Sequence, residues 1–395
     1  MSDTGDIVVG VVGAGAMGRG IAQVAAAAGH HVVLGDADAG ASGRARDALR
    51  TSLARGVAKG QIDQASADDT LERIVDAGSV STSLGAYADC GIVIEAIVEE
   101  LEAKRDLFGG LQRVVASECI LATNTSSLSI AAIASACQRA DRVLGVHFFN
   151  PAPVMTLVEL IPAITSGAEA VARARALVES WGKTTVVATD TPGFIVNRVA
   201  RPFYGESLRI LEEGIADVAT IDWAMCELGG FRMGPFELMD FIGNDINYAV
   251  TTSVYEGFFN DPRYRPALTQ RRLVEAGLFG RKRKRGYYDY RPEAEVPVAS
   301  KDAVLGQQIV DRVVAMLVNE AIEALHMRVA SASDIELAMT KGVNYPRGLL
   351  HWGDEIGAPE ILRRLDALQA EYGEDRYRPS PLLRRRVREG RGLVT

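Results

Sequence analysis

The sequence of 395 residues predicts an α/β domain with a mostly parallel sheet, followed by two tandem all-α C-terminal domains. Three observations lead to this prediction. Short apolar runs alternate with helical patterns up to residue 190, as in parallel sheets that helices cover on both faces. Helical patterns alone follow from residue 191, and a set of them recurs further along the chain. The expected parts are residues 1–190, a first helical copy 191–290, a linker 291–304 and a second copy 305–395.

The first apolar run, residues 7–12, leads directly into Gly13-Ala14-Gly15-Ala16-Met17-Gly18. Apolar residues then recur at helical spacing as far as Gly29, and a second apolar run ends in Asp36. A strand, a GxGxxG turn, a helix and a second strand with a terminal acid are the fingerprint of a Rossmann-type dinucleotide-binding unit. Asp36 would accept hydrogen bonds from ribose hydroxyls and would repel a 2′-phosphate. The expected cofactor is therefore NAD and not NADP.

Further apolar runs complete the predicted sheet: Ile92–Ile94, Ile120–Ala122, Val143–Val146 and Thr185–Val187. Ligands of such sheets bind beyond the carboxyl ends of the strands. Polar residues stand at those ends, namely Glu95, Glu99, residues 124–127 and His147. We expect one cleft to collect them.

His147 is the single histidine, of five in the chain, that follows a predicted strand at this edge. Glu159 lies in the apolar run 157–161, where an unpaired carboxylate would be costly. If residues 151–153 turn the chain back, the two runs become neighbouring strands and Glu159 can accept the imidazole N–H. The other ring nitrogen of His147 would then act as a general base toward a substrate hydroxyl.

The second half of the chain is expected to form helices over 194–213, 218–228 and 236–259, and it contains a repeat. Residues 195–199 return 114 positions later as 309–313, and Arg263-Tyr264-Arg265-Pro266 returns as Arg376-Tyr377-Arg378-Pro379 after a slip of one residue. The second copy has Asp311 where the first has Asn197, so we expect it to be structural. The copies should pack as a pseudo-twofold pair that takes the place of a dimer contact, which leaves the oligomeric state open.

The composition disfavours several other classes of protein. A balance of 43 Lys+Arg against 51 Asp+Glu, a net charge of −8, would repel nucleic acid. No run approaches the ~18 apolar residues of a membrane helix. Asp3 and Asp6 are the wrong residues for the start of a secretory signal, so a cytoplasmic protein without a membrane partner is expected. Neither a disulfide framework nor a metal is expected, because no CxxC pair occurs among Cys90, Cys119, Cys137 and Cys226.

The chain resembles the 3-hydroxyacyl-CoA dehydrogenases of fatty-acid and aromatic-acid breakdown. The segments that carry the resemblance are 13–18, Glu95-Ala96-Ile97-Val98-Glu99, 123–128, His147–Pro151, Thr191–Arg198 and Gly286–Tyr290. Residues 234–240 and the tandem tail look most like the bacterial branch that acts on 3-hydroxyadipyl-CoA or 3-hydroxybutyryl-CoA, the former in phenylacetate breakdown. The resemblance implies NAD-dependent oxidation of a (3S)-3-hydroxyacyl-CoA.

The resemblance also implies roles for individual residues. His147 would be the base and Glu159 its orienting partner, with Ser126 and Asn197 as donors to the substrate oxygen. Cofactor contacts would come from Gly13, Gly15, Ala16, Met17, Gly18, Asp36, Glu99, Lys104, Asn150 and Lys282, and CoA contacts from Ser52, Lys59 and Ser126. The chain departs from the family at Arg283 and Lys284, where a small hydroxyl residue and a glycine are usual, so the role of Lys282 and of the basic run 281–285 stays open.

Two alternatives to this function make different predictions about the sequence. A β-hydroxyacid-type dehydrogenase acting on a substrate without CoA would use a lysine base near the domain junction, and residues 190–213 contain no lysine. A catalytically inactive nucleotide-binding relative would be expected to lack at least one of Ser126, His147, Glu159 and Asn197, and all four are present.

Overall fold

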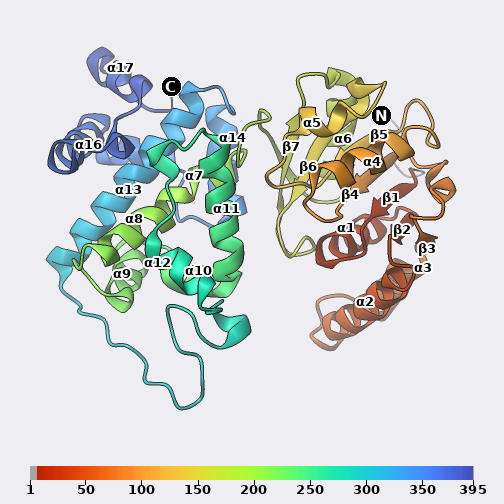
Figure 1. Ribbon diagram of the computed structural model, residues 1–395, viewed down its shortest axis with the longest axis horizontal. Coiled ribbons are helices and arrows are strands. Elements are labelled where there is room, and N and C mark those ends of the chain that lie inside the picture. The colour runs from red at the N-terminus through yellow and green to blue at the C-terminus, as the bar shows by residue number, and fades with distance from the viewer. Residues whose placement is uncertain (1–6, 395) are drawn as a thin grey trace. The chain divides into compact units, whose positions relative to one another are not determined.

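The computed structural model describes residues 7–394 and divides into two compact units, Met1–Thr191 and Pro192–Thr395 (Figure 1). Asp3 and Asp6, which entered the argument about a secretory signal, lie outside the described residues.

The first unit is built on one eight-stranded sheet in the order β3-β2-β1-β4-β5-β6-β7-β8. All neighbouring strands are parallel except β6 and β7, which are antiparallel. The predicted mostly parallel sheet is therefore confirmed. The strands are β1 Val9–Val12, β2 Val32–Asp36, β3 Ile74–Ser79, β4 Ile92–Glu95, β5 Ile120–Thr123, β6 Val143–Phe148, β7 Leu157–Pro162 and β8 Thr184–Val187.

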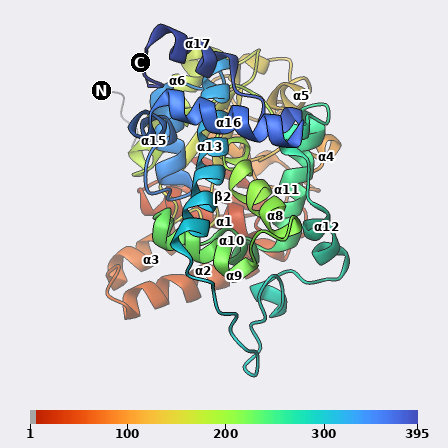
Figure 2. The same ribbon diagram turned by 90° about the vertical axis from the view of Figure 1, so that its left-hand side faces the viewer.

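The helices of this unit, several of which are labelled in both views, lie against the sheet (Figures 1 and 2). They bury its apolar side chains. They are α1 Ala16–Ala27, α2 Ala41–Ala58, α3 Gln64–Glu72, α4 Leu101–Leu111, α5 Ile130–Ala134 and α6 Ala168–Ser180, with 3₁₀ turns at Gly85–Tyr87 and Ala140–Arg142. Helices α1 and α2 contact the β1–β3 side of the sheet, and α5 and α6 contact the β6–β8 side. The edge strand β3 was not predicted, because Ile74 is its one fully buried residue and Asp76 and Gly78 interrupt its apolar pattern.

The second unit contains helices and no strands in its described residues, as the sequence predicts. Its helices are α7 Val196–Val199, α8 Arg201–Glu212, α9 Val218–Trp223, α10 Pro235–Ile242, α11 Asn244–Gly257, α12 Leu268–Glu275, α13 Ala303–His326, α14 Ala332–Leu337, α15 Leu349–Ile356, α16 Ala358–Tyr372 and α17 Pro381–Glu389. π-helical turns follow α9 at Ala224–Leu228 and α14 at Ala338–Gly342, and 3₁₀ turns occupy Pro262–Tyr264, Arg281–Arg283 and Asp375–Tyr377.

Two of the expected helices are each divided into two, so those expectations were wrong in detail. The segment 194–213 breaks between α7 and α8, next to Pro202, which has no N–H for the helical ladder. The segment 236–259 breaks at Gly243, whose φ of +106° is accessible to glycine and strained for other residues.

The two copies of the repeat contact each other through reciprocal buried ion pairs. In one direction Arg198 Nε donates to Glu320 at 2.7 Å, and in the other Arg312 Nε donates to Glu206 at 2.6 Å. A tyrosine from a 3₁₀ turn of each copy binds the same acids. The Tyr264 hydroxyl donates to Glu320 at 2.6 Å, and the Tyr377 hydroxyl donates to Glu206 at 2.7 Å. Each arginine therefore contacts the glutamate of the other copy, and the two contacts are equivalent in the repeat. Such reciprocal contacts are the signature of pseudo-twofold packing.

Candidate active site

The glycine loop between β1 and α1 leaves space where a cofactor phosphate would lie. A Cβ atom on Gly13 would come within 2.4 Å of the Ala96 carbonyl oxygen, and one on Gly18 within 1.7 Å of the Gly13 oxygen. Gly15 differs, because nothing lies within 4 Å of a Cβ placed there. Helix α1 then begins at Ala16 and Met17 with no acid in its first turn and no side-chain cap, so its amide groups face that space without a competing carboxylate. This loop fits a dinucleotide pyrophosphate.

Asp36 ends β2 beside this loop. Its Oδ2 accepts the Ala14 N–H at 2.7 Å and its Oδ1 accepts the Asp38 N–H at 3.0 Å. The two bonds hold the carboxylate at the carboxyl edge of the sheet next to the turn, where an adenosine ribose is bound in dinucleotide folds.

His147 and Glu159 lie opposite each other on the antiparallel strands β6 and β7. The His147 Nδ1–H donates to Glu159 Oε2 at 2.8 Å, and both side chains are buried. The loop between the strands does turn back as the sequence argument required, through a cis Asn150–Pro151 peptide. The pairing assigns the Nδ1 position of His147 to Glu159.

A buried lysine, Lys104, binds two acids at and just after the end of strand β4. Lys104 Nζ donates to Glu95 Oε1 at 2.6 Å and lies 3.1 Å from Glu99 Oε2, with the lysine and Glu95 almost completely buried. Glu99 Oε1 also accepts the Thr125 hydroxyl at 2.6 Å and the Ser126 N–H at 3.0 Å. Burial raises the pKa of Glu99, but the charge of Lys104 and these hydrogen bonds outweigh it and hold the pKa below its usual value.

This arrangement changes the interpretation of two residues. Lys104 was expected among the cofactor contacts, whereas its ammonium points into the protein and holds Glu95 and Glu99. Glu95, to which the sequence analysis assigns a place at a strand end but no role, also accepts the Thr123 hydroxyl at 2.7 Å. The available signal was an acid that directly continues an apolar strand.

Several predicted contacts lie at accessible places in the first unit. Ser126 is half-buried just after β5, and Asn150 is exposed after β6. Ser52 and Lys59 are both exposed and lie two turns apart, within and at the end of α2, so they share one helix face.

The two remaining predicted residues belong to the second unit. Asn197 is half-buried in α7, and its carbonyl oxygen accepts Arg201 Nε at 2.6 Å. Lys282 Nζ lies 2.6 Å from the Asp245 carboxylate, in a turn where Arg281 also pairs with Glu237. The ammonium of Lys282 thus has an acid partner within its own unit.

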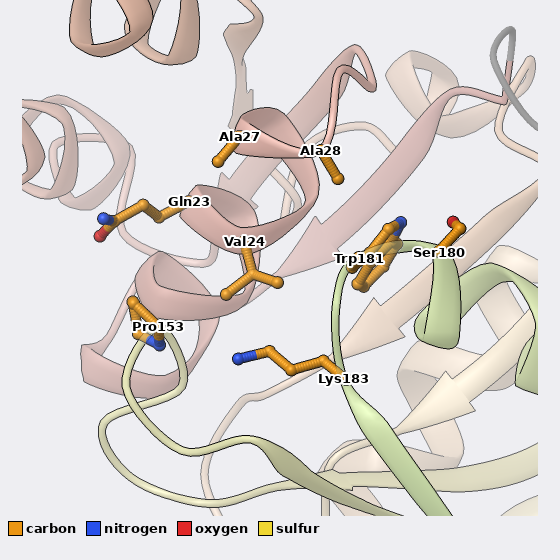
Figure 3. A pocket seen from close by; sticks show the side chains of 8 residues that line it. All are labelled: Gln23, Val24, Ala27, Ala28, Pro153, Ser180, Trp181 and Lys183. Atoms are coloured by element: carbon orange, nitrogen blue, oxygen red, sulfur yellow. The ribbon is translucent and has the colours of Figure 1, made fainter. Parts of the chain in front are cut away.

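A cavity of about 340 Å³ in the first unit involves none of these residues. Figure 3 shows it between the end of α1 and the turn into β8, with Trp181, Lys183 and Pro153 in its wall. Lys183 Nζ donates to the carbonyl oxygens of Ala152 at 2.6 Å and Met155 at 2.8 Å. The lysine therefore anchors the loop that joins the strands of His147 and Glu159.

Two other classes of feature are absent from the described residues. Between residues 7 and 394, no helix is long and apolar enough to cross a membrane. The same residues contain no group of three or more histidine, cysteine or acidic side chains that could hold a metal ion.

Comparison with known proteins identifies the family. The NAD-binding domain of 3-hydroxyacyl-CoA dehydrogenase matches residues 8–191, and the C-terminal domain of the same family matches twice, over 193–290 and 309–392. The 3-hydroxyadipyl-CoA dehydrogenase of Escherichia coli is 40% identical, over 96% of this chain and 97% of its own length. A 3-hydroxybutyryl-CoA dehydrogenase of Bradyrhizobium diazoefficiens is 43% identical, over 73% of this chain and 97% of its own.

A solved structure agrees with these relatives. The crystal structure of a 3-hydroxybutyryl-CoA dehydrogenase from Escherichia coli has a TM-score of 0.91 and 39% identity, and the match covers 97% of this chain and 98% of that one. Because both family domains match and a 40% identical relative aligns over 96% of this chain, the chain belongs to the 3-hydroxyacyl-CoA dehydrogenase family and is an NAD-dependent enzyme of it.

Proposed function

We propose that the protein oxidises a (3S)-3-hydroxyacyl-CoA to the 3-oxoacyl-CoA, with 3-hydroxyadipyl-CoA as the best substrate and 3-hydroxybutyryl-CoA as a poorer one. The observation that carries the proposal is the buried His147–Glu159 pair at the carboxyl edge of a sheet whose first turn fits a dinucleotide. The relative named for 3-hydroxyadipyl-CoA, which spans the whole tandem arrangement, supports the choice of substrate.

In this mechanism the protein moves one proton. NAD, when bound, supplies the acceptor for the hydride that leaves C3. His147 Nε2 takes the proton of the C3 hydroxyl, and Glu159 holds the ring and stabilises the imidazolium that forms. Ser126 and Asn197 donate hydrogen bonds to the C3 oxygen, which carries negative charge as the proton leaves. In the reducing direction the same proton returns from Nε2 to that oxygen.

The other expected contacts belong to this proposal as well. Asp36 would bind the adenosine ribose, and Glu99 and Asn150 would lie toward the nicotinamide half, with Lys104 acting through Glu99. Ser52 and Lys59 would hold the CoA moiety. The proposed division of the chain keeps 1–190, 191–290, 291–304 and 305–395 as its parts. The proposed compartment is the cytoplasm, which suits cysteines that are all free.

The direct test is NADH oxidation, followed by absorbance, with acetoacetyl-CoA and with 3-oxoadipyl-CoA. Turnover of both, with the higher kcat/KM for 3-oxoadipyl-CoA, is the expected result. Failure to turn over either compound would refute the proposed function.

NAD should be preferred to NADP. The Asp36 carboxylate, held by the Ala14 and Asp38 N–H groups, would repel the negative charge of a 2′-phosphate. The next residue is Ala37 and not an arginine that could bind this phosphate. We expect kcat/KM for NADH to exceed that for NADPH by at least about 100-fold, since a close like-charge contact costs several kcal/mol. Asp36→Ala should reduce the preference, and a wild-type preference for NADPH would contradict it.

Truncation after Tyr290 should expose an apolar face. The rings of Phe203 and Phe231 in the first copy pack at 5.7 and 5.0 Å against Tyr345 of the second, and Phe231 lies 5.7 Å from Trp352. We expect the shortened chain to aggregate or to form a new dimer, seen by light scattering. A truncated chain that is monomeric, soluble and fully active would show that the second copy covers nothing of consequence.

A further inference from the structure

Arg201, the first residue of α8, carries a buried charge that the protein does not neutralise. Its side chain is 7% exposed, and no carboxylate lies within 4.0 Å of it in the described part of the chain. Nε donates to the Asn197 carbonyl oxygen at 2.6 Å, Nη1 donates to Thr251 Oγ1 at 3.1 Å, and the guanidinium lies 4.9 Å from the centre of the Tyr204 ring. Burial lowers the pKa of Arg201.

The other buried arginines bind acids or several backbone carbonyl groups. Arg198 and the largely buried Arg312 each bind a buried glutamate, at 2.7 and 2.6 Å. Arg263 and Arg376 lie 3.3 and 3.5 Å from the same two acids, Glu320 and Glu206. Arg142 has no acid partner among residues 7–394, but its two terminal nitrogens donate to four backbone carbonyl groups. An unneutralised buried cation with two neutral acceptors is costly to the fold, so a reason other than stability is needed for Arg201.

The repeat supplies an internal control for this argument. Asn247 and Gln270 extend the polar cluster, because Gln270 Nε2 donates to Asn247 Oδ1 at 2.7 Å. The equivalent positions of the second copy are all apolar and buried. An offset of 114 residues pairs Arg201 with Ala315, Asn247 with Ile361 and Thr251 with Leu365, and the offset of 113 that follows the slip pairs Gln270 with Leu383. The same helical arrangement therefore packs with an apolar core, and the polar cluster is a property of the copy that carries Asn197.

The cluster is also incomplete as a hydrogen-bond network. The Tyr345 hydroxyl, which can donate, is buried without a partner in the described residues. Tyr345 lies near Arg201 in the fold, since its ring packs 5.7 Å from that of Phe203, two residues after Arg201. A half-satisfied buried network is less stable than an apolar core, which again indicates that a ligand completes it. A guanidinium and a phenolic hydroxyl are both donors, and the ligand that accepts from both is a carboxylate.

We propose that Arg201 binds a carboxylate at the far end of the acyl chain and so selects dicarboxylic 3-hydroxyacyl-CoA substrates. This rests on the proposed function, in which Asn197 binds the C3 oxygen. Arg201 Nε donates to the Asn197 carbonyl oxygen at 2.6 Å across the break between α7 and α8, so the two residues are neighbours, with side chains on the scale of about 5–6 Å apart. The carbons between C3 and a C6 carboxylate span a gap of this size, so one substrate can reach both residues.

The test compares two substrates of equal chain length, 3-oxoadipyl-CoA and 3-oxohexanoyl-CoA, which differ in the terminal carboxylate. The wild type should favour 3-oxoadipyl-CoA. In Arg201→Gln the ratio of the two kcat/KM values should fall by about 10- to 100-fold, the worth of a charge-assisted hydrogen bond to a buried group. Arg201→Lys, which keeps the charge without the planar fork, should lose less. Arg271→Gln, an exposed arginine on α12, is the matched control and should leave the ratio unchanged.

The outcomes separate this inference from the function on which it rests. If the wild type reduces neither compound, the proposed function fails. If the wild type reduces both equally well, Arg201 does not select a carboxylate, and this result needs no variant to fold. If Arg201→Gln lowers both kcat/KM values by the same factor, the residue serves to position Asn197 or to bind CoA, and the inference is overturned.

Discussion

His147→Ala should lower kcat for acetoacetyl-CoA reduction by about 10²- to 10⁴-fold, the usual contribution of a general acid or base. The reason is the pairing with Glu159, which leaves Nε2 as the atom that gives the proton to the forming hydroxyl. The affinity for NADH, measured by fluorescence titration, should stay nearly the same, because the imidazole acts in the chemical step and not in cofactor binding. Unchanged turnover would refute the mechanism.

Glu159→Gln should be the milder of the two changes. The amide can still occupy the space beside Nδ1, but it loses the negative charge that stabilises the imidazolium. A suitable control exists in the second copy, where His351 Nδ1 also meets a glutamate, Glu336, at 2.7 Å. The His351 side chain is 66% exposed and belongs to the structural copy, so His351→Ala should leave kcat as it is. A loss in His351→Ala equal to that in His147→Ala would show that the assay reports stability.

Glu320→Ala should destabilise the helical unit by about 3–5 kcal/mol, the typical cost of removing one partner from a buried ion pair. Glu320 accepts from Arg198 and Tyr264 and lies 3.3 Å from Arg263, so its loss leaves two buried guanidinium groups without this carboxylate. The measurement is the midpoint of urea unfolding of the full chain. Glu206→Ala should have a similar effect, since Glu206 holds the equivalent place in the pseudo-twofold arrangement.

The matched control is Glu360→Ala. Glu360 pairs with Arg363 and Arg364 on the outer side of α16, where solvent screens the charges, and we expect little change in the midpoint. A Glu320→Ala midpoint equal to that of Glu360→Ala would mean that the reciprocal pairs do not hold the two copies together.

Much of the active site could be predicted from the sequence because local chemistry specifies it. The glycine pattern of loop 13–18 predicts the geometry of the loop, because glycine is required wherever a Cβ would collide or would block a ligand. The position of Asp36 is predicted by the end of the second apolar run. The pairing of His147 with Glu159 was accessible for a related reason. An acid inside an apolar strand requires a partner, and the turn at 151–153 left one strand close enough to provide it.

The rest was decided by tertiary structure, because it depends on which side chains meet across long stretches of chain. The sequence pattern around a basic residue in an amphipathic helix does not show whether its side chain faces solvent or the interior. The contact of Lys104 with Glu95 could therefore not be predicted from the residues that flank Lys104. The arginines show this most clearly. Arg198 and Arg201 are three residues apart, yet the first meets Glu320 across 122 positions and the second meets no acid among residues 7–394. Sequence spacing predicts that both residues are helical, although they lie on the separate helices α7 and α8. Whether a buried charge has a counter-ion within the fold depends on the packing of the second copy against the first.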